Sequence, residues 1–412
     1  MKILCIFCDM LRSDKISLLN EEQKEDKLDL FLRKFGGTIF KNSFSPTPDT
    51  GRALASFFTG KCSKNNGCYF QYQYPKYYLK DIYNLGNLLE DKNIKYKFII
   101  REESYILGNF PDDIKNVVRI DKKNSFKMET IKALNELKNS EDYFLFLDID
   151  DYHLAVDVYG SIDEAYIIGK NKIYSVLKYI FENIDKNELD YTFIFSDHGH
   201  KDNITKQNII KGDLNLLFPD RSKIFLLARK KNEKNIKINN NIKSILDFMP
   251  TFMDIFNIKI KNNFDGQSLF LNNKNRIIAL EGNENFFDPY SKLNVWGAAH
   301  KDYIFITNKL KKIILSNKNI KNNIDEKQIL NIIEKETCNY IFEDKKLLNE
   351  FQIRELKEKI KKINFYILTS YKYSDDSLIS YKKYIKINIK SLFIKIKFYE
   401  IILKLRRFMK NE

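Results

Sequence analysis

The chain is poor in glycine, proline and cysteine. Its 412 residues include only 14 glycines and 7 prolines, which argues against fibrous and repeat proteins, and no solenoid or propeller period is visible. An odd, sparse set of five cysteines does not indicate a disulfide framework. A Cys62–Cys68 pair stays open as an alternative, although a reducing compartment is the simpler interpretation. The cysteines are Cys5, Cys8, Cys62, Cys68 and Cys338.

Long apolar runs are also missing. No stretch reaches the roughly 18 consecutive apolar residues of a membrane-spanning helix. The first apolar run, Ile3–Phe7, is too short for the apolar region of a signal peptide, and no cleavage site follows it. We therefore expect a cytoplasmic protein.

Positive charge is in excess, with a formal net charge of +15. Much of it gathers in residues 381–412, where ten Lys or Arg stand against only Glu400 and Glu412. A nucleic-acid-binding protein would carry the charge on its main domain with interleaved aromatic residues, and no such module is visible. A nucleic-acid partner is therefore not expected.

The basic tail also carries apolar residues on one helical face, including Ile385, Ile389 and Leu392. We expect a main domain of residues 1–325 and a helical, basic C-terminal region of residues 326–412. A basic amphipathic segment can lie on an anionic membrane surface, which would place the protein on the inner face of the membrane. The alternatives are a packed terminal helix with a solvated face, or a strand.

Short, continuous apolar runs alternate with helical patterns along the main domain. At 43% hydrophobic residues the composition is that of a globular protein. The apolar runs are typical of strands buried on both faces of a sheet, and this alternation predicts a three-layer α/β/α sandwich with a mostly parallel central sheet. Lys/Asn-rich patches such as 231–243 and 317–323 are interpreted as solvated loops. The expected strands are Ile3–Phe7, Thr38–Asn42, Lys95–Ile100, Tyr143–Leu147, Tyr191–Phe195 and Tyr303–Thr307, and the expected helices are Gln23–Phe35, Arg52–Phe58, Leu85–Glu90, Ser125–Leu137 and Tyr166–Ile184.

Carboxylates and histidines follow three of the predicted strands. Asp9 follows the first, and the runs 148–153 and 196–200 follow two others. Loops at the carboxyl edge of a parallel sheet converge in space, so these side chains are expected to lie together, although Asp9 could instead cap the next helix. All four histidines of the chain stand near predicted strand ends, which is a strong concentration of one residue type; they are His153, His198, His200 and His300.

The stretch 46–60 holds the candidate nucleophile. Thr50 stands just before the predicted helix Arg52–Phe58, at a position where a hydroxyl can cap the first turn. The positive end of the helix dipole also favours an anionic phosphorus or sulfur centre there. An ordinary threonine cap is the alternative, and it is the commoner case.

Six segments, in order, resemble the sulfatase-like branch of the alkaline phosphatase superfamily, which includes phosphodiesterases and phospho-head-group transferases. The resemblance covers about residues 1–315 and implies an alkaline-phosphatase-like fold, with residues 1–325 as the catalytic domain. The segments are Asp9-Met-Leu-Arg-Ser-Asp14, Asp151-Tyr-His153, Phe195-Ser-Asp-His-Gly199, the predicted helix 244–258, Asp265-Gly266 and Ala299-His-Lys-Asp-Tyr-Ile304.

The resemblance implies that Thr50 is the nucleophile, because the family nucleophile opens a helix nine residues before a Thr-Gly pair, here Thr59-Gly60. Sulfatases carry Cys-x-Pro-Ser-Arg at this place, whereas this chain has Thr50-Gly51-Arg52. Sulfatases oxidise the Cys or Ser to formylglycine, and a threonine cannot give that aldehyde. Phosphodiesterases and phosphotransferases of the superfamily commonly use Thr directly, so phosphoryl chemistry is expected.

The resemblance also implies the other site residues. One divalent metal ion (Mn²⁺, Zn²⁺, Mg²⁺ or Ca²⁺) would lie among the ligands Asp9, Thr50, Asp197 and His198. His153, His300 and Lys301 are the catalytic candidates that act on the leaving group, and the substrate-binding candidates are Arg52, Asn66, Arg101 and His200. His200 could instead form a second metal site with His153 and His300, but no Asp-x-x-x-His spacing supports it, since residue 149 is Ile.

The leading hypothesis is a metal-dependent phosphotransferase or phosphodiesterase. Its expected partners are a phospho-ester donor and a glycan or small-molecule acceptor, with a role in decorating a bacterial surface polysaccharide such as a capsule. Two alternatives remain: a sulfatase-like hydrolase of another ester, and a catalytically silent member of the family that binds an anionic glycan or lipid.

Overall fold

The computed structural model describes residues 1–69, 71, 82–102, 104, 110, 114–120, 125–160, 162–200, 213–258, 263–273, 275–283, 294–308, 312–316 and 325–337. The basic tail 381–412, the patch 317–323 and Cys338 lie outside the described residues, so the predictions made for them stay predictions. No helix among the described residues is long and apolar enough to cross a bilayer. The four described cysteines are free thiols, so Cys62 and Cys68 are not paired.

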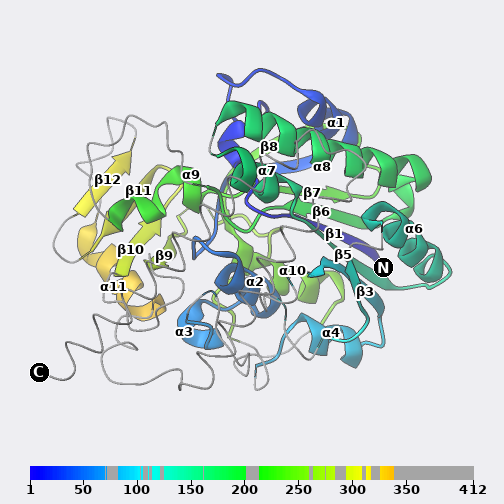
Figure 1. Ribbon diagram of the computed structural model, residues 1–412. Coiled ribbons are helices and arrows are strands. Elements are labelled where there is room, and N and C mark those ends of the chain that lie inside the picture. The colour runs from blue at the N-terminus through cyan, green and yellow to red at the C-terminus, as the bar shows by residue number, and fades with distance from the viewer. Residues whose placement is uncertain are drawn as a thin grey trace, which may run out of the picture.

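An eight-stranded sheet forms the centre of the main domain (Figure 1). Its pairings are parallel except that β7 runs antiparallel to both neighbours. This confirms the predicted mostly parallel sheet. In spatial order the strands are β4 (Val117–Ile120), β3 (Lys95–Arg101), β5 (Tyr143–Ile149), β1 (Lys2–Cys8), β6 (Tyr191–Phe195), β7 (Leu226–Lys230), β2 (Gly37–Phe44) and β8 (Ile236–Ser244).

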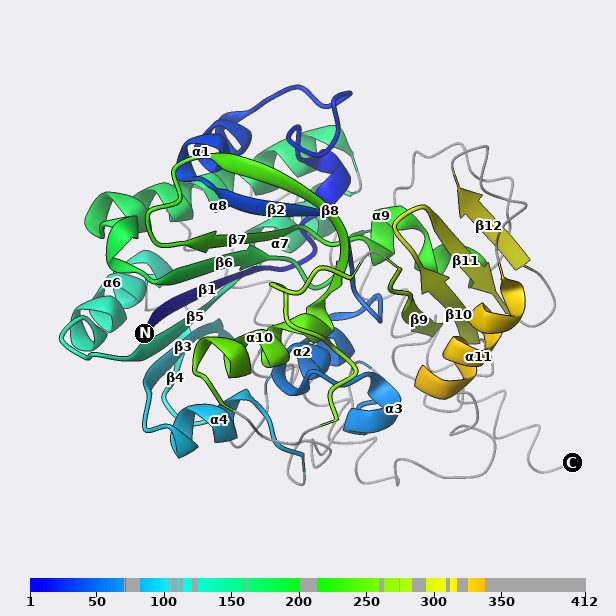
Figure 2. The same cartoon turned by 180° about the vertical axis from the view of Figure 1, so that it is seen from behind.

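Helices cover both faces of this sheet (Figures 1 and 2). The alternation along β1 explains why: Leu4 and Ile6 enter one apolar core, while Ile3 and Phe7 enter the other. The predicted three-layer sandwich is confirmed. The first core is closed by α1 (Lys27–Phe35), α6 (Phe126–Leu137), α7 (Asp151–Tyr159) and α8 (Asp163–Asn183), and the second by α2 (Thr50–Thr59), α4 (Leu85–Asp91) and α10 (Phe248–Ile255).

A second, four-stranded antiparallel sheet lies to one side of the main sheet (Figure 2). Its order is β12 (Lys312–Ser316), β11 (Tyr303–Thr307), β10 (Asn294–Ala299) and β9 (Ile278–Asn283). Helix α11 (Glu326–Glu336) begins at the predicted domain boundary and packs Ile329 and Ile333 against Trp296 of β10. Further short helices in the described part of the chain are α3 (Ser63–Asn66) and α9 (Pro219–Ser222), and 3-10 turns occur at Ser13–Lys15, Lys186–Glu188, Asp213–Leu217 and Ile245–Asp247.

One sequence interpretation is wrong. Residues 231–243 were expected to form a solvated loop, but β8 (Ile236–Ser244) is the edge strand of the main sheet, paired parallel to β2. An edge strand tolerates many Lys and Asn residues because water reaches one side of it, and the polar run there conceals its strand character.

Candidate metal centre and nucleophile

The ends of two adjacent strands bring the first acidic residues together. Asp9 follows β1 and Asp197 follows β6, which pairs with β1. Between them, Met10 adopts a left-handed φ of 59°, and its backbone N–H donates to Asp197 Oδ1 at 3.1 Å. Such a backbone conformation is uncommon for a residue other than glycine. The turn therefore directs Asp9 toward Asp197.

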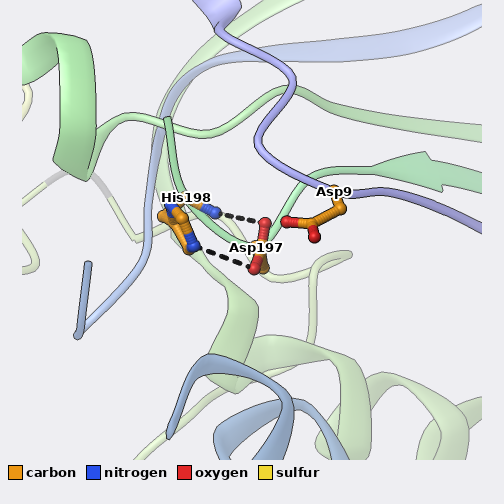
Figure 3. A group of neighbouring side chains, drawn as sticks. All are labelled: Asp9, Asp197 and His198. Atoms are coloured by element: carbon orange, nitrogen blue, oxygen red, sulfur yellow. Dashed lines mark hydrogen bonds and ion pairs between the residues drawn. The ribbon is translucent and has the colours of Figure 1, made fainter. Parts of the chain in front are cut away.

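Asp9, Asp197 and His198 form a buried cluster with metal-ligand character. One ligand atom from each lies within 4.8 Å of the others, and Figure 3 shows the Asp9 carboxylate pointing toward Asp197. Asp197 Oδ1 accepts hydrogen bonds from the backbone of Met10 and His198. Asp197 Oδ2 accepts none within the described part of the chain, although His198 Nε2 lies 3.2 Å away. The cluster therefore contains a buried carboxylate oxygen directed at its neighbours.

The Thr50 hydroxyl completes this cluster. Its Oγ1 lies 3.4 Å from Asp9 Oδ1 and 3.3 Å from His198 Nε2. The predicted helix cap was misplaced by one residue: Asp49 is the N-cap of α2, its side chain accepting from the backbone of Arg52 at 3.1 Å. Thr50 is instead the first residue of the helix, because the carboxylate of Asp49 accepts the free backbone N–H and favours the positive end of the helix dipole. Its hydroxyl is thus available to the cluster.

His153 reaches the same cluster from the first turn of α7. Its Nδ1 lies 2.8 Å from Asp9 Oδ2, and its Nε2 lies 3.4 Å from Asp157. Burial would lower the pKa of His153, but Asp157 and Asp9 outweigh it and raise the pKa to about 10. Burial would likewise raise the pKa of Asp9, yet His153 and His198 hold it below its usual value. An imidazolium–carboxylate pair results.

The donor set fits a divalent cation. Two buried carboxylates, one imidazole and one hydroxyl suit a borderline or hard metal ion. Burial, reinforced by Asp9, raises the pKa of Asp197 to about 6 against the opposing effect of His198. Buried carboxylates that repel one another in this way are stabilised by a positive ion between them. The residues that would hold it are Asp9, Thr50, Asp197 and His198, the set expected from the sequence.

His200 lies near the cluster. Its backbone carbonyl accepts from Arg12 at 3.3 Å, and Arg12 also bonds Asp14. Burial, together with the positive charges of His153 and Arg221, lowers the pKa of His200 to about 3. His200 is therefore a neutral imidazole in an electropositive neighbourhood.

Arg101 is the last residue of β3 and lies beside acidic residues that follow β5. Its Nε lies 3.1 Å from Asp150, and its Nη2 lies 3.2 Å from Asp151. Burial raises the pKa of Asp150 to about 6, and Asp148 behind it also has a raised pKa because it is fully buried. The described ion pairs of Arg101 are those with Asp150 and Asp151.

Arg52 and Asn66 make internal contacts. Arg52 is 3% exposed and forms ion pairs with Asp49 and with Glu281 of β9. Asn66 is fully buried, donating to the carbonyl of Lys61 and accepting from the backbone of Cys68 at 2.8 Å. Both side chains fix the segments around α2, and phosphate binding by Arg52 would have to compete with its two carboxylates.

His300 and Lys301 lie in the turn between β10 and β11. The His300 ring stacks on Tyr303 with centroids 4.9 Å apart, and its Nδ1 lies 3.5 Å from Asp302, while Lys301 is also near Asp302. Their described contacts stay within this turn and do not join them to Thr50. Their assignment as leaving-group residues stays a prediction.

Sequence reasoning missed Arg221. Its Nη2 donates to the carbonyl of Pro48, two residues before Thr50, at 3.1 Å. Arg221 belongs to a four-residue helix, α9, and to none of the six motif segments. The only sequence signal would have been the isolated Pro219, which opens that helix.

The sequence matches no family model and no curated protein. Solved structures with the same fold include a 2-O GAG sulfatase, at 11% identity with a TM-score of 0.59, which covers 88% of this chain and 93% of that one. The phosphonate monoester hydrolase of Agrobacterium radiobacter has 12% sequence identity and a TM-score of 0.55, and the match covers 81% of this chain and 94% of that one. A protein solved in complex with its substrate D-glucosamine-2-N,6-O-disulfate has 11% sequence identity and a TM-score of 0.55, and the match covers 81% of this chain and 97% of that one.

Identities this low establish a common architecture and leave the chemistry to the residues of each chain. The resemblance read from the motifs is thereby confirmed at the level of fold: the chain has the fold of the sulfatases and phosphonate monoester hydrolases in the sulfatase-like branch of the alkaline phosphatase superfamily.

Proposed function

We propose that the protein is a metal-dependent enzyme of phosphate-ester chemistry with Thr50 as its covalent nucleophile. The observation that carries the proposal is the position of the Thr50 hydroxyl, 3.4 Å from Asp9 and 3.3 Å from His198 at the first residue of α2. Neighbours in fold that include sulfatases and a phosphonate monoester hydrolase support the wider class, a hydrolase of this superfamily.

The identity of the nucleophile favours phosphoryl over sulfuryl transfer. A sulfatase of this branch needs Cys or Ser for the formylglycine aldehyde, and residue 50 is Thr. A threonine hydroxyl attacks phosphorus directly and gives a phospho-threonine. The same residue also accounts for a transferase, since an acceptor hydroxyl can replace water in the second step.

Each residue of the site has its own role in the proposed reaction. The Thr50 oxygen forms a bond to phosphorus while the bond to the leaving oxygen breaks, and the hydroxyl proton passes to Asp9, its carboxylate neighbour. A bound divalent cation would lower the pKa of the hydroxyl and offset the charge of the attacked group. Protonated His153 is placed beside Asp9 to give a proton to the leaving oxygen. Water or an acceptor hydroxyl then attacks phosphorus and gives its proton to the now neutral His153, while the bond from Thr50 to phosphorus breaks and the Thr50 oxygen takes its proton back from Asp9.

We further propose a glycan or small-molecule acceptor, in keeping with modification of a surface polysaccharide. The basic segment 381–412 would bring the enzyme to an anionic membrane surface that presents such acceptors. Both proposals rest on sequence character. Sedimentation of the full chain with phosphatidylglycerol vesicles but not with phosphatidylcholine vesicles supports the membrane contact, and equal sedimentation contradicts it.

The test compares hydrolysis of bis-(p-nitrophenyl) phosphate and p-nitrophenyl sulfate by the manganese-loaded protein. Thr50→Ala should abolish phosphodiester turnover, at least 10³-fold by the general scale for loss of a nucleophile. The matched control is Thr130→Ala, which removes a buried helical threonine bonded only to the carbonyl of Phe126 among its described contacts. That control should keep full turnover.

Three other results would contradict the proposal in different ways. Turnover of the sulfate but not the diester would make the protein a sulfatase-like hydrolase of another ester. Turnover that persists in Thr50→Ala would exclude this nucleophile. Metal binding without any turnover would indicate a silent binding protein.

A further inference from the structure

Strand β9 forms one edge of the small sheet, and its backbone contacts the loop that leads to the nucleophile. The backbone N–H of Glu281 donates to the carbonyl of Pro46 at 2.8 Å. An edge strand has backbone groups without a partner in its own sheet, so it can bond a neighbouring segment in this way. The loop 46–49 is therefore attached to the small sheet just before Thr50.

The Glu281 side chain makes a second contact, with the first turn of α2. Its Oε1 lies 3.4 Å from Nη1 of Arg52, and the same guanidinium also pairs with Asp49. The backbone of Arg52 donates to Asp49 as well, at 3.1 Å. All three residues are buried, Glu281 being the most exposed of them at 8%. Because salt screens buried charges much less than exposed ones, this contact persists at physiological ionic strength.

Thr50 lies between these two points of attachment. Pro46 is bonded before it and Arg52 after it, and Thr50 is the first residue of the helix. Its Oγ1 lies 3.4 Å from Asp9 and 3.3 Å from His198, both longer than an ordinary hydrogen bond of a hydroxyl group. A small shift of the loop would take the hydroxyl out of reach, and a misplacement of about 1 Å can cost about 100-fold in rate.

The apolar core of the small sheet gives Glu281 a fixed base. Its neighbour Leu280 is fully buried in a cluster that includes Leu216 and Leu217. On the other side, Gly282 lies close to the same two leucines, since a Cβ there would be 3.3 Å from each of them. Close packing on both sides of Glu281 restricts movement of its backbone.

We propose that Glu281 is a positioning residue, which fixes the loop 46–49 and the first turn of α2 so that the Thr50 hydroxyl faces the metal centre. The inference rests on the proposed function and gives the small sheet a part in the reaction. Glu281 acts on Thr50 through Pro46 and Arg52. A buried ion pair of this kind adds little net stability, because the desolvation of two charges offsets their attraction, and its main effect here is on geometry.

Turnover of bis-(p-nitrophenyl) phosphate by the manganese-loaded full chain tests the assignment. In Glu281→Leu, kcat and kcat/KM should fall equally, about tenfold or more, because the contact acts on the attack and not on substrate binding. Glu281→Gln keeps an oxygen that can accept from Arg52 and loses the charge, so its kcat should fall between. Manganese affinity, measured by calorimetry, should stay native in both variants, because Asp9, Asp197 and His198 follow strands of the main sheet.

The matched control is Arg276→Gln, which removes a charge from a different ion pair of the same region. Arg276 pairs with Asp247 at 2.7 Å and so fastens the segment before β9 to the start of α10. This variant should keep native kcat. Hydrogen exchange of the peptide 45–58 gives a readout that does not depend on turnover: exchange should be faster in Glu281→Leu and native in Arg276→Gln.

Native kcat in Glu281→Leu, or native exchange of the peptide 45–58, would overturn the inference. So would an equal loss of kcat in Arg276→Gln or a parallel loss of manganese affinity, because Glu281 would then support only the general stability of the fold. If Glu281→Leu does not fold, Glu281→Gln decides by the same readouts. Absence of Thr50-dependent turnover would contradict the proposed function and this inference with it, whereas Thr50-dependent turnover with native kcat in both Glu281 variants would contradict this inference alone.

Discussion

At the scale of single residues, the site depends on side chains that lie far apart in the sequence. Asp9, Thr50 and His198 meet within hydrogen-bonding distance from the ends of β1, the start of α2 and the end of β6. Sequence reasoning predicted these residues because strand-end carboxylates and an ordered set of motifs point to one edge of the sheet. It also selected Asn66 and Arg52, whose side chains make internal contacts in the structure, because the sequence pattern does not show which way a side chain points.

His153 is expected to make the unfolding free energy of the metal-free protein depend on pH. Its pKa of about 10 in the folded state exceeds the roughly 6.5 expected when unfolded, so the folded state binds the extra proton between these values. The stabilisation is fully present below about pH 6.5 and is lost as the pH rises through 10. In chelator, the difference in unfolding free energy between native protein and His153→Gln should therefore shrink from pH 6 to pH 10 in urea titrations. A difference that does not change with pH would contradict the ion pair with Asp9.

At the scale of elements, α2 and the loop before it are held from several sides. The backbone of Glu281 in β9 donates to the Pro46 carbonyl at 2.8 Å, and its carboxylate pairs with Arg52. Asp49 caps the helix and pairs with the same arginine. These contacts join the small sheet to the nucleophile loop, an arrangement that no local pattern in the sequence predicts because Glu281 lies more than 200 residues away.

Asp49 should therefore contribute more to the unfolding free energy than an ordinary helix cap does. Asp49→Ala removes the cap and one carboxylate from a buried guanidinium, which predicts a loss of about 3 kcal/mol of unfolding free energy. The matched control is Ser125→Ala at the N-cap of α6, which has no such ion pair and should lose about 1 kcal/mol. Denaturant titration measures both. Equal losses of unfolding free energy in the two variants would mean that the Asp49–Arg52 pair adds nothing to stability.

Gly199 tests the contact between the metal loop and α9. Gly199→Ala places a Cβ 2.0 Å from the carbonyl oxygen of Asp220, so the loop that carries Asp197 and His198 has to move. We expect manganese affinity to fall at least tenfold, measured by calorimetry. Gly86→Ala is the control, since its Cβ meets only side-chain atoms, of Asn84 at 3.0 Å and Ile114 at 3.3 Å, and its manganese affinity should be native. An unchanged affinity in Gly199→Ala would show that the loop adapts freely.

At the scale of the whole molecule, the fold class was predictable and the topology was not. Continuous apolar runs such as Tyr143–Leu147 and Tyr191–Phe195 mark buried strands, and the structure extends the first to Ile149 and keeps the second. The spatial order of the strands follows from long-range pairing, which a local pattern does not contain. The antiparallel β7 and the Lys/Asn-rich edge strand β8 are the parts that local reasoning missed or misread.

The architecture alone does not decide the chemistry. Proteins of this fold at 11–12% identity include sulfatases and a phosphonate monoester hydrolase, so one architecture is found with different named activities. In this chain we propose that the deciding group is the Thr50 hydroxyl, which lies beside Asp9 and His198. The central claim is that this hydroxyl forms a covalent bond to phosphorus during turnover.

The most direct measurement is intact-mass spectrometry of the manganese-loaded protein, acid-quenched during turnover of bis-(p-nitrophenyl) phosphate. The account predicts an adduct of one aryl phosphoryl group, with nitrophenolate released, mapped by peptide analysis to Thr50. The adduct should be present in Thr130→Ala and absent in Thr50→Ala. Turnover by the native protein with no adduct at Thr50, or with the adduct on another residue, would contradict the account.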